Sequence, residues 1–395
     1  MKPHRVVHAY KIYKPDVEGG IPEVISTLVS GSSGEFSNSI LVARKLGISR
    51  SHHVDGVPVT AVSSFGTIFS TPISFSYPFE LLKRARDTDI VVHHAPFPLS
   101  DMAISAHFPS HVGLIVFWHA EVMGRAMLKR AVAPFVTATL QRADKIIISH
   151  QSLIDRFDSL KPYAEKTKVI PFGTELDFWS ALDSEQSIPV QQKRDQFPRL
   201  VVFLGRLVGY KGLDVLIDAI SRTNAQLAII GSGPLQEQLT RQANELGLAD
   251  RVHFLGKLTR AEVKSFLHAE RALVLPSVTS AEAYGLVQME AMAAGCPVIN
   301  TDLPTAVPHI ARHNQEGLTV PPNDSSALAQ AIQNILDDPD LRTRLGRAAK
   351  ERAFSEYSAN VFRDRMASVY REVIGARARI QEAGTAPTHL SPRNQ

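Results

Sequence analysis

The chain has 395 residues, a formal net charge of +4, 44% hydrophobic residues and 21% charged residues. A length beyond what one hydrophobic core usually serves predicts two domains, and the composition is that of a folded globular protein. The sequence excludes a membrane-spanning helix, because it has no apolar run of 18 residues, and a disulfide framework, because it has a single cysteine, Cys296. The basic charge comes without a dense basic run, which argues against a nucleic-acid partner. Lys2, His4 and Arg5 lead directly into an apolar strand, so we expect no signal peptide and a cytoplasmic protein.

The N-terminal half predicts a doubly wound α/β domain over residues 1–180. An apolar strand at residues 6–10 is followed by Gly19-Gly20 and a helical pattern. Further strands are expected at residues 39–43, 57–62, 89–94, 114–119 and 145–149, with His52 and His53 in a loop. The last four strands are almost continuously apolar, as parallel strands buried on both faces are. Helical patterns between several of them complete the doubly wound arrangement.

The C-terminal half predicts a second domain of the same kind. Residues 181–199 are polar and lack hydrophobic periodicity, which predicts a linker. Strands and helices alternate again over residues 200–354, as in a second doubly wound sheet. A further helix is expected over residues 355–375. Residues 379–395 lack apolar periodicity and are expected to be disordered.

Five features follow the carboxyl ends of predicted strands, which is where open α/β sheets bind ligands. They are Gly19-Gly20, Trp118-His119, the loop from Arg206 to Lys211, the segment from Gly231 to Gly233, and the loop that bears Glu282. Because these features come from both domains, they predict one binding cleft between the domains.

The stretch SAEAYGLVQMEAMAAGCPVI, residues 280–299, carries two carboxylates, Glu282 and Glu290, on either side of Gly285. The residues after Gly285 are good helix formers, so we expect a helix to begin there, with Glu290 about one and a half turns inside it. A helix start leaves N–H groups that suit a phosphate, and an ionised carboxylate accepts hydrogen bonds from sugar hydroxyls. These features are typical of a nucleotide-sugar site, with Glu290 on the ribose and Glu282 on a second sugar. Taken alone, the stretch also fits an ordinary amphipathic helix.

Three further polar side chains are candidates at the same strand ends. Arg206 and Lys211 lie on a glycine-flanked loop after a buried strand, where two cations can neutralise a diphosphate. The alternative is two solvated surface residues. His119 can donate to a hydroxyl or stabilise a leaving group. The alternative for His119 is a half-buried histidine bonded to the backbone.

No credible metal site is found in the sequence, and we expect neither a metal nor a cofactor. Asp87-Thr-Asp89 has the D-x-D spacing of some metal-binding sites, but it precedes an apolar strand and so lies at the wrong end for the site. It is interpreted as a turn from a helix to a strand. The fifteen histidines include no pattern such as HExxH.

The segment over residues 121–142 interleaves basic and apolar residues. It fits a basic amphipathic helix that rests on an anionic membrane surface, but a buried domain helix whose arginines and lysines reach solvent is favoured over that alternative.

With these residues assembled, the chain resembles the retaining glycosyltransferases of family 4, which have the GT-B fold of two Rossmann-like domains facing across a cleft. The resemblance covers residues 4–375. It is carried by the two glutamates of the 280–299 stretch, by Gly205-Arg-Leu with Lys211-Gly, and by Gly231-Ser-Gly-Pro.

The resemblance implies a role for each candidate residue. Arg206 and Lys211 bind the donor diphosphate, Glu290 binds the ribose and Glu282 binds the transferred sugar. His119 lies beside the anomeric centre. The remaining donor-site residues are Gly20, Gly231, Tyr284, Gly285, Leu286 and Val287. The helix over residues 355–375 is implied to pack back on the first domain.

The donor preference rests on the N-terminal stretch up to Glu23, which looks most like bacterial mannosyltransferases of polysaccharide assembly. The resemblance therefore implies GDP-mannose as donor and a lipid-linked or oligosaccharide acceptor. Residues 171–177 depart from the Asn-Gly-Val-Asp turn that is common in the family, so no contact is carried over there. A UDP-sugar transferase, a GT-B nucleotide-sugar epimerase and an inert binding module remain the alternatives.

Overall fold

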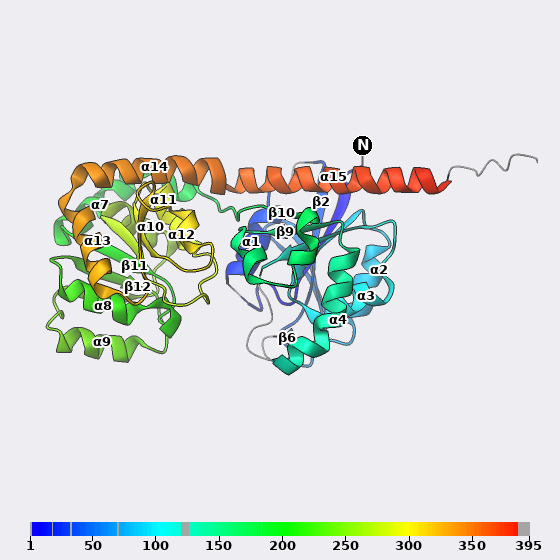
Figure 1. The fold of residues 1–395 in the computed structure, drawn as a ribbon, viewed down its shortest axis with the longest axis horizontal. Coiled ribbons are helices and arrows are strands. Elements are labelled where there is room, and N and C mark those ends of the chain that lie inside the picture. The colour runs from blue at the N-terminus through cyan, green and yellow to red at the C-terminus, as the bar shows by residue number, and fades with distance from the viewer. Residues whose placement is uncertain are drawn as a thin grey trace, which may run out of the picture. The chain divides into compact units, whose positions relative to one another are not determined.

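The structure is a computed structural model that describes residues 2–17, 19–31, 34–68, 71–119, 126–182 and 184–385, without the side chains of residues 126–129, 184–186 and 383–385. The chain divides into two compact units, each built around its own sheet (Figure 1). The first unit comprises Met1–Ser149, Leu153–Pro171 and Phe362–Gln395, and the second comprises His150–Ser152 and Phe172–Val361.

The first unit holds an eight-stranded sheet in the order β10-β9-β8-β7-β1-β2-β4-β3. Its strands are β1 (His4–Ala9), β2 (Phe36–Ala43), β3 (Arg50–Val54), β4 (Val57–Val62), β7 (Ile90–Ala95), β8 (Gly113–Trp118), β9 (Lys145–Ile148) and β10 (Thr167–Val169). All are parallel except β3, which pairs antiparallel with β4. His52 and His53, expected in a loop, are therefore in a strand at the sheet edge, and the loop prediction is wrong.

Helices cover both faces of this sheet because its central strands are apolar on both sides. Side chains of α2 (Tyr77–Ala85), α3 (Pro98–His107) and α4 (Ala126–Arg142) pack on one face, and those of α1 (Gly20–Val29) pack on the other. The remaining elements are β5 (Thr67–Ile68), β6 (Thr71–Pro72), α5 (Ser152–Arg156) and the 3-10 helix η1 (Lys161–Lys166).

The second unit holds a six-stranded parallel sheet in the order β13-β12-β11-β14-β15-β16. Its strands are β11 (Leu200–Leu204), β12 (Gln226–Ile230), β13 (Val252–Gly256), β14 (Ala272–Leu275), β15 (Val298–Thr301) and β16 (Gly317–Val320). Its helices are α6 (Asp177–Ser180), α7 (Ser184–Gln196), η2 (Gly209–Lys211), α8 (Leu213–Ser221), α9 (Gln236–Glu245), α10 (Arg260–Ala269), α11 (Val287–Ala293), α12 (Val307–Ile310), α13 (Ser325–Asp337) and α14 (Pro339–Tyr357).

The last helix, α15 (Ala359–Thr385), belongs to the first unit from Phe362 onwards. Arg363 Nε donates to the carbonyl of Thr27 at 2.8 Å, and the Phe362 ring lies 6.2 Å from that of Phe117. This helix begins four residues later than expected. It also runs through residues 379–385, which were expected to be disordered, so that part of the expectation is wrong; residues 386–395 lie outside the described part of the chain.

The segment over residues 181–199 is also corrected. It holds α7 rather than a linker, and it lies within the second unit. Val190 is buried, and Arg194 Nη2 donates to the carbonyl of His268 on α10 at 2.7 Å. The sequence hides this helix because Pro189 interrupts it and most of its residues are polar. Across the described residues, no helix is long and apolar enough to cross a membrane.

Candidate functional site

The strand order of the second unit reverses between β11 and β14, since the chain runs from β11 outwards to β13 and then returns to the other side of β11. Ligands of open α/β sheets bind outside the carboxyl ends of the strands at such a reversal. The loop after β11 carries Arg206 and Lys211, and the loop after β14 carries Glu282. The topology therefore brings these sequence-predicted residues to one point of the fold.

Glycines allow the loops after β11 and β12 to pack backbone against backbone. A Cβ on Gly231 would lie 1.9 Å from the carbonyl oxygen of Gly205, and one on Gly233 would lie 2.3 Å from that of Leu207. Leu207 N donates to the carbonyl of Ser232 at 3.1 Å. Gly231, predicted to bind the donor, thus has a structural reason to be glycine that is independent of any ligand.

Lys211 is held against the loop after β14. The next residue, Gly212, has φ +66°, and a Cβ there would lie 2.2 Å from the carbonyl oxygen of Pro276. Val278 N donates to the carbonyl of Tyr210 at 2.9 Å. Because backbone contacts fix both sides of Lys211, its ammonium group is directed at the reversal point.

Lys211 forms an ion pair with Glu282, whose Oε2 also accepts from Ser277 Oγ at 3.2 Å. The two side chains are only 11% and 10% exposed. The sequence predicted that these residues contact different parts of a donor, and it did not predict that they contact each other. Arg206, by contrast, is exposed to solvent.

The helix of the 280–299 stretch starts later than expected. α11 begins at Val287 rather than Gly285, so Glu290 lies in the first turn and not one and a half turns inside. Gly285 has φ +75°, and a Cβ there would lie 2.6 Å from Leu275 Cδ2 and 2.9 Å from Gln288 Nε2. Close packing moves Gly285 and Leu286 out of the helix and into the loop that precedes it.

A buried amide network that the sequence analysis missed holds this loop. Gln288 Nε2 donates to the carbonyl of Tyr284 at 3.1 Å, and Asn300 Nδ2 donates to Gln288 Oε1 at 2.9 Å and to the carbonyl of Ala311 at 2.9 Å. The Tyr284 hydroxyl accepts from Phe172 N at 3.1 Å. The signal was an asparagine within the apolar strand at residues 298–301, because a buried amide needs partners.

In the first unit, Gly20 and His119 lie at the carboxyl edge of the sheet. Gly20 is the first residue of α1, which follows β1, and is exposed. His119 directly follows β8 and is 6% exposed. His119 is therefore buried, and the alternative of a half-buried histidine is wrong.

His119 belongs to a hydrogen-bonded chain of three histidine rings, which we call the histidine chain. His119 Nε2 lies 2.9 Å from His94 Nδ1, and His94 Nε2 lies 3.1 Å from His8 Nδ1. His8 Nε2 lies 3.3 Å from Asn38 Oδ1. The chain thus crosses β8, β7, β1 and β2. No feature of the sequence distinguishes His94 from a chance histidine.

Burial keeps the histidine chain uncharged at neutral pH. Loss of hydration lowers the pKa of His8 to about 4 and the pKa of His119 to about 3. It lowers the pKa of His94 well below its ordinary value, and the neighbouring histidines act in the same direction. His93 points to the other face, where its Nε2 lies 3.1 Å from Asp101 Oδ1.

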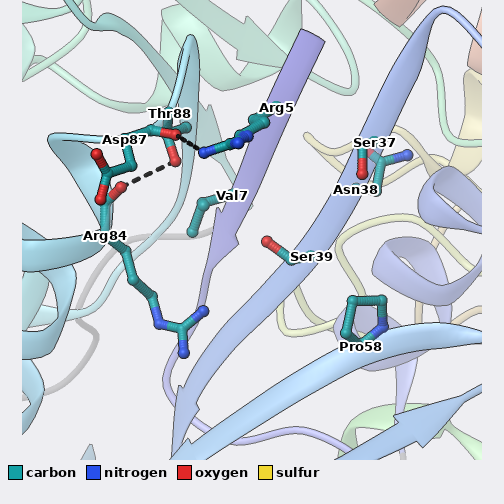
Figure 2. A pocket seen from close by; sticks show the side chains of 9 residues that line it. All are labelled: Arg5, Val7, Ser37, Asn38, Ser39, Pro58, Arg84, Asp87 and Thr88. Carbon is teal, nitrogen blue, oxygen red and sulfur yellow. Dashed lines mark hydrogen bonds between the residues drawn. The ribbon is translucent and has the colours of Figure 1, made fainter. Parts of the chain in front are cut away.

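The D-x-D segment lies at the opposite, amino edge of the sheet, as the sequence predicts. Asp87 and Asp89 fall between α2 and β7, and the carbonyl of Asp87 accepts from Arg5 Nη1 at 3.1 Å (Figure 2). The adjacent pocket, of about 310 Å³, is lined by both Arg5 and Arg84. Arg84 is paired with Glu80 at 2.8 Å, and Asp87 lines the pocket beside Arg5, so no excess charge selects an anion. In the part of the chain that is described, no group of three or more His, Cys, Asp or Glu side chains is placed to hold a metal ion.

The membrane-helix hypothesis for residues 121–142 is only partly covered by the described residues. α4 begins at Ala126, and residues 120–125 lie outside the described part. At the other end Leu140 is buried, and Arg142 Nη2 donates to the carbonyl of Val112 at 2.7 Å. The end of this helix is therefore packed into the first unit.

A chain with two doubly wound, Rossmann-like units has the architecture of the GT-B fold, and solved structures share that fold. The chain matches sucrose-phosphate synthase from Thermosynechococcus elongatus with a TM-score of 0.73 at 21% identity, covering 94% of this chain and 100% of that one. It matches WaaG, a glycosyltransferase involved in lipopolysaccharide biosynthesis, with a TM-score of 0.65 at 18% identity, covering 92% and 99%.

The sequence comparisons name the family. Residues 184–352 match the family described as glycosyl transferases group 1. The chain is 31% identical over 357 residues to the D-rhamnosyltransferase WbpZ of Pseudomonas aeruginosa, covering 88% of this chain and 91% of that protein. It is 28% identical over 380 residues to the O-antigen chain mannosyltransferase C of Escherichia coli, covering 95% and 100%. The protein belongs to the group 1 glycosyltransferases.

Proposed function

We propose that this glycosyltransferase moves a mannosyl residue from GDP-mannose, with retention of configuration, to a lipid-linked or oligosaccharide acceptor in cell-surface polysaccharide assembly. The observation that carries the proposal is the Lys211–Glu282 pair at the strand-order reversal of the second unit. A diphosphate needs a cation, and a sugar needs a carboxylate that accepts from its hydroxyls. The Lys211 ammonium group and the Glu282 carboxylate lie together at this reversal point.

In this proposal the residues divide the donor between them. Lys211 and the exposed Arg206 bind the diphosphate, together with amides of the loop from Tyr284 to Val287 and with Gly231 nearby. Glu282 orients the transferred sugar and Glu290 binds the ribose. Gly20 approaches the donor from the first unit, and His119 meets the sugar beside its anomeric carbon. The protein supplies the positive charge itself, so no metal or other cofactor is required.

The manno configuration of the sugar is supported by two relatives. One is a mannosyltransferase, and the other is a D-rhamnosyltransferase, whose sugar is the 6-deoxy form of D-mannose. The sugars of the two relatives differ at carbon 6, so the relatives support the manno configuration but do not select the substituent at carbon 6. We place the reaction in the cytoplasm at the inner face of the membrane, where a lipid-linked acceptor is anchored.

The donor is tested by thermal shift, because a ligand that binds only the folded state raises the melting temperature by mass action. GDP is expected to raise it more than UDP at matched concentration, and GDP-mannose to support transfer to a lipid-linked acceptor. A larger shift with UDP would reverse the donor assignment. Release of UDP and an epimerised sugar without acceptor would favour the epimerase alternative.

A further inference from the structure

Six large apolar side chains are exposed on the first unit, in the segments that follow β2 and β4. The exposed fractions are Leu46 64%, Ile48 83%, Phe65 73%, Ile68 54%, Phe75 74% and Phe79 75%. We call these six residues the apolar patch. Single exposed apolar residues are ordinary, but a group of this size marks an interaction surface.

Hydrogen bonds and ring contacts connect the segments that carry the apolar patch. Gly47, between Leu46 and Ile48, exchanges two backbone hydrogen bonds of 2.9 Å with Ser64, which precedes Phe65. The rings of Phe65 and Phe75 lie 5.8 Å apart. Phe79 follows Phe75 by four residues, at the start of α2. The two segments therefore form one surface and not two.

The charge around the apolar patch is positive. Residues 44–84 hold five Lys or Arg and two Asp or Glu, whereas the whole chain has a net charge of only +4. Arg44 is paired with Asp16 and Arg84 with Glu80, while Lys45, Arg50 and Lys83 are exposed to solvent. The patch therefore carries exposed cations beside its aromatic rings.

We propose that the apolar patch docks on a bilayer surface that contains anionic phospholipid. Aromatic and aliphatic side chains enter the interface, and Lys45, Arg50 and Lys83 bind lipid phosphates. A second copy of the chain is a poorer occupant, because a two-fold interface sets the same patch against itself and brings like charges together. The patch lies at the same sheet edge as His119, so docking brings the lipid surface to that edge.

The test is flotation of the full chain with vesicles of phosphatidylcholine containing about 30% phosphatidylglycerol. We expect binding that weakens with salt and a loss of at least about tenfold in partition for Phe65→Ser/Phe75→Ser/Phe79→Ser, since binding scales with inserted apolar area. The matched control is Ile188→Ser/Leu246→Ser, which removes exposed apolar residues of the second unit, 63% and 41% exposed. Circular dichroism and gel filtration check that each variant is folded.

Equal partition of the triple variant and the wild type would overturn the proposal, as would absence of binding by the wild type. A wild type that dimerises in solution, with the triple variant monomeric, would assign the patch to a second copy instead. None of these outcomes depends on which sugar is transferred, so docking and the proposed function can fail separately.

A second inference concerns the histidine chain, and it rests on the proposed role of His119. The amide oxygen Oδ1 of Asn38 can only accept a hydrogen bond, so His8 must donate to it from Nε2. The other ring nitrogen of His8, Nδ1, is then an acceptor. His94 must then donate from Nε2 and accept at Nδ1. His119 must donate from Nε2. Each ring therefore fixes the tautomer of the next.

We infer that Asn38, His8 and His94 are positioning residues that hold the proton of His119 on Nε2. The histidine chain ends at the amide of Asn38, which cannot take up a proton. The chain therefore sets the tautomer and orientation of His119 and does not carry a proton away from it. Nδ1 of His119 then carries the lone pair. Because the proton on Nε2 is committed to His94, His119 does not act as an acid.

The test is ¹⁵N NMR of the full chain labelled at histidine, with assignment by substitution. We expect all three rings to be protonated at Nε2. His8→Phe keeps a ring but cannot hydrogen-bond, and it is expected to give His119 mixed tautomers and to lower kcat about tenfold at unchanged donor KM. Asn38→Asp keeps the acceptor and is expected to keep the wild-type tautomer.

Protonation of His119 at Nδ1 in the wild type would overturn the inferred direction, and an unchanged His119 spectrum in His8→Phe would overturn the positioning role. The spectra decide this whether or not mannosyl transfer is observed.

Discussion

The two units share a reversal of strand order and differ in electrostatics. The first unit has the strand order β3-β4-β2-β1-β7-β8-β9-β10 and the second β13-β12-β11-β14-β15-β16, so both reverse beside their first strand. At the first reversal stand His8 and His94, which burial keeps neutral. At the second stand Lys211 and Glu282, an ion pair. The topology sets the place of a site, and the residues at the strand ends set its chemistry.

This difference matches a division of labour between the two halves of the proposed reaction. A nucleotide-sugar brings two negative phosphates, which favour the charged edge of the second unit. A sugar hydroxyl is neutral and needs oriented acceptors and donors, which the histidine chain supplies without the cost of burying a charge.

Glu282→Ala is expected to have the largest effect on transfer, a loss of about a thousandfold in turnover, because it removes the carboxylate that we propose orients the sugar. The substitution also leaves the largely buried Lys211 ammonium group without its ion-pair partner, so the melting temperature should also fall. In the double variant Lys211→Ala/Glu282→Ala the melting temperature should recover while activity stays lost.

The control for Glu282→Ala is Glu245→Ala, which removes an exposed carboxylate from α9. Near-wild-type turnover of Glu282→Ala, with a normal far-ultraviolet spectrum, would remove Glu282 from the mechanism.

Gly231→Ala tests whether the charged edge depends on backbone packing. The added Cβ would meet the Gly205 carbonyl at 1.9 Å, so we expect a loss of about 3 kcal/mol in stability. Gly247→Ala is the matched control, because Gly247 also has positive φ, +69°, but nothing lies within 4 Å of its Cβ position. Denaturant unfolding followed at Trp179 measures both, and equal losses would show that close packing of the loops is unimportant.

Lys211→Ala is expected to lower turnover about a hundredfold, because a preorganised cation no longer meets the charge that grows on the leaving diphosphate. Wild-type activity should be unchanged in excess EDTA. Lys257→Ala, an exposed lysine of the same unit, serves as the control. Activity that vanishes in EDTA and returns with magnesium or manganese would assign the leaving group to a metal.

The sequence predicted best what depends on periodicity and strand order. Continuous apolar runs identified the buried parallel strands, and parallel strands place their carboxyl ends at one edge, so the loops of Lys211 and Glu282 were brought together correctly. Features set by close packing were missed. The helix start moved from Gly285 to Val287 because the Leu275 and Gln288 side chains fill the space beside the glycine.

Long-range side-chain partners could not be predicted either. His8, His94 and His119 are separated by 86 and 25 residues, and no periodicity connects them. α7 was missed for the opposite reason, since its own residues are polar and only a few of them, such as Val190, face the core. In both cases the determining contact lies elsewhere in the chain.

Acidification is expected to change the stability of the two units in opposite directions. The three rings of the histidine chain have a lowered pKa in the folded state, about 4 for His8 and about 3 for His119. Below the ordinary value of about 6.5 the unfolded chain takes up protons that the folded chain does not, so the first unit loses stability as the pH falls. Burial raises the pKa of Glu270 in the second unit well above its usual range. A raised pKa means that the folded chain binds this proton more readily than the unfolded chain does, so the group adds stability as the pH falls.

The two tryptophans report on the two units separately, since Trp118 ends β8 and Trp179 lies in α6. In single-tryptophan variants, Trp118 is expected to report a melting temperature that falls more than that of Trp179 between pH 7.5 and 5.5. His8→Phe should reduce the acid loss of the first unit by about 1 kcal/mol, because one histidine contributes about 1.4 kcal/mol per pH unit below its unfolded pKa. His53→Phe, on the exposed edge strand β3, should leave the loss unchanged. Parallel curves for the two tryptophans would show that the histidine chain is already charged in the folded protein, and the contrast between a neutral and a charged sheet edge would then be wrong.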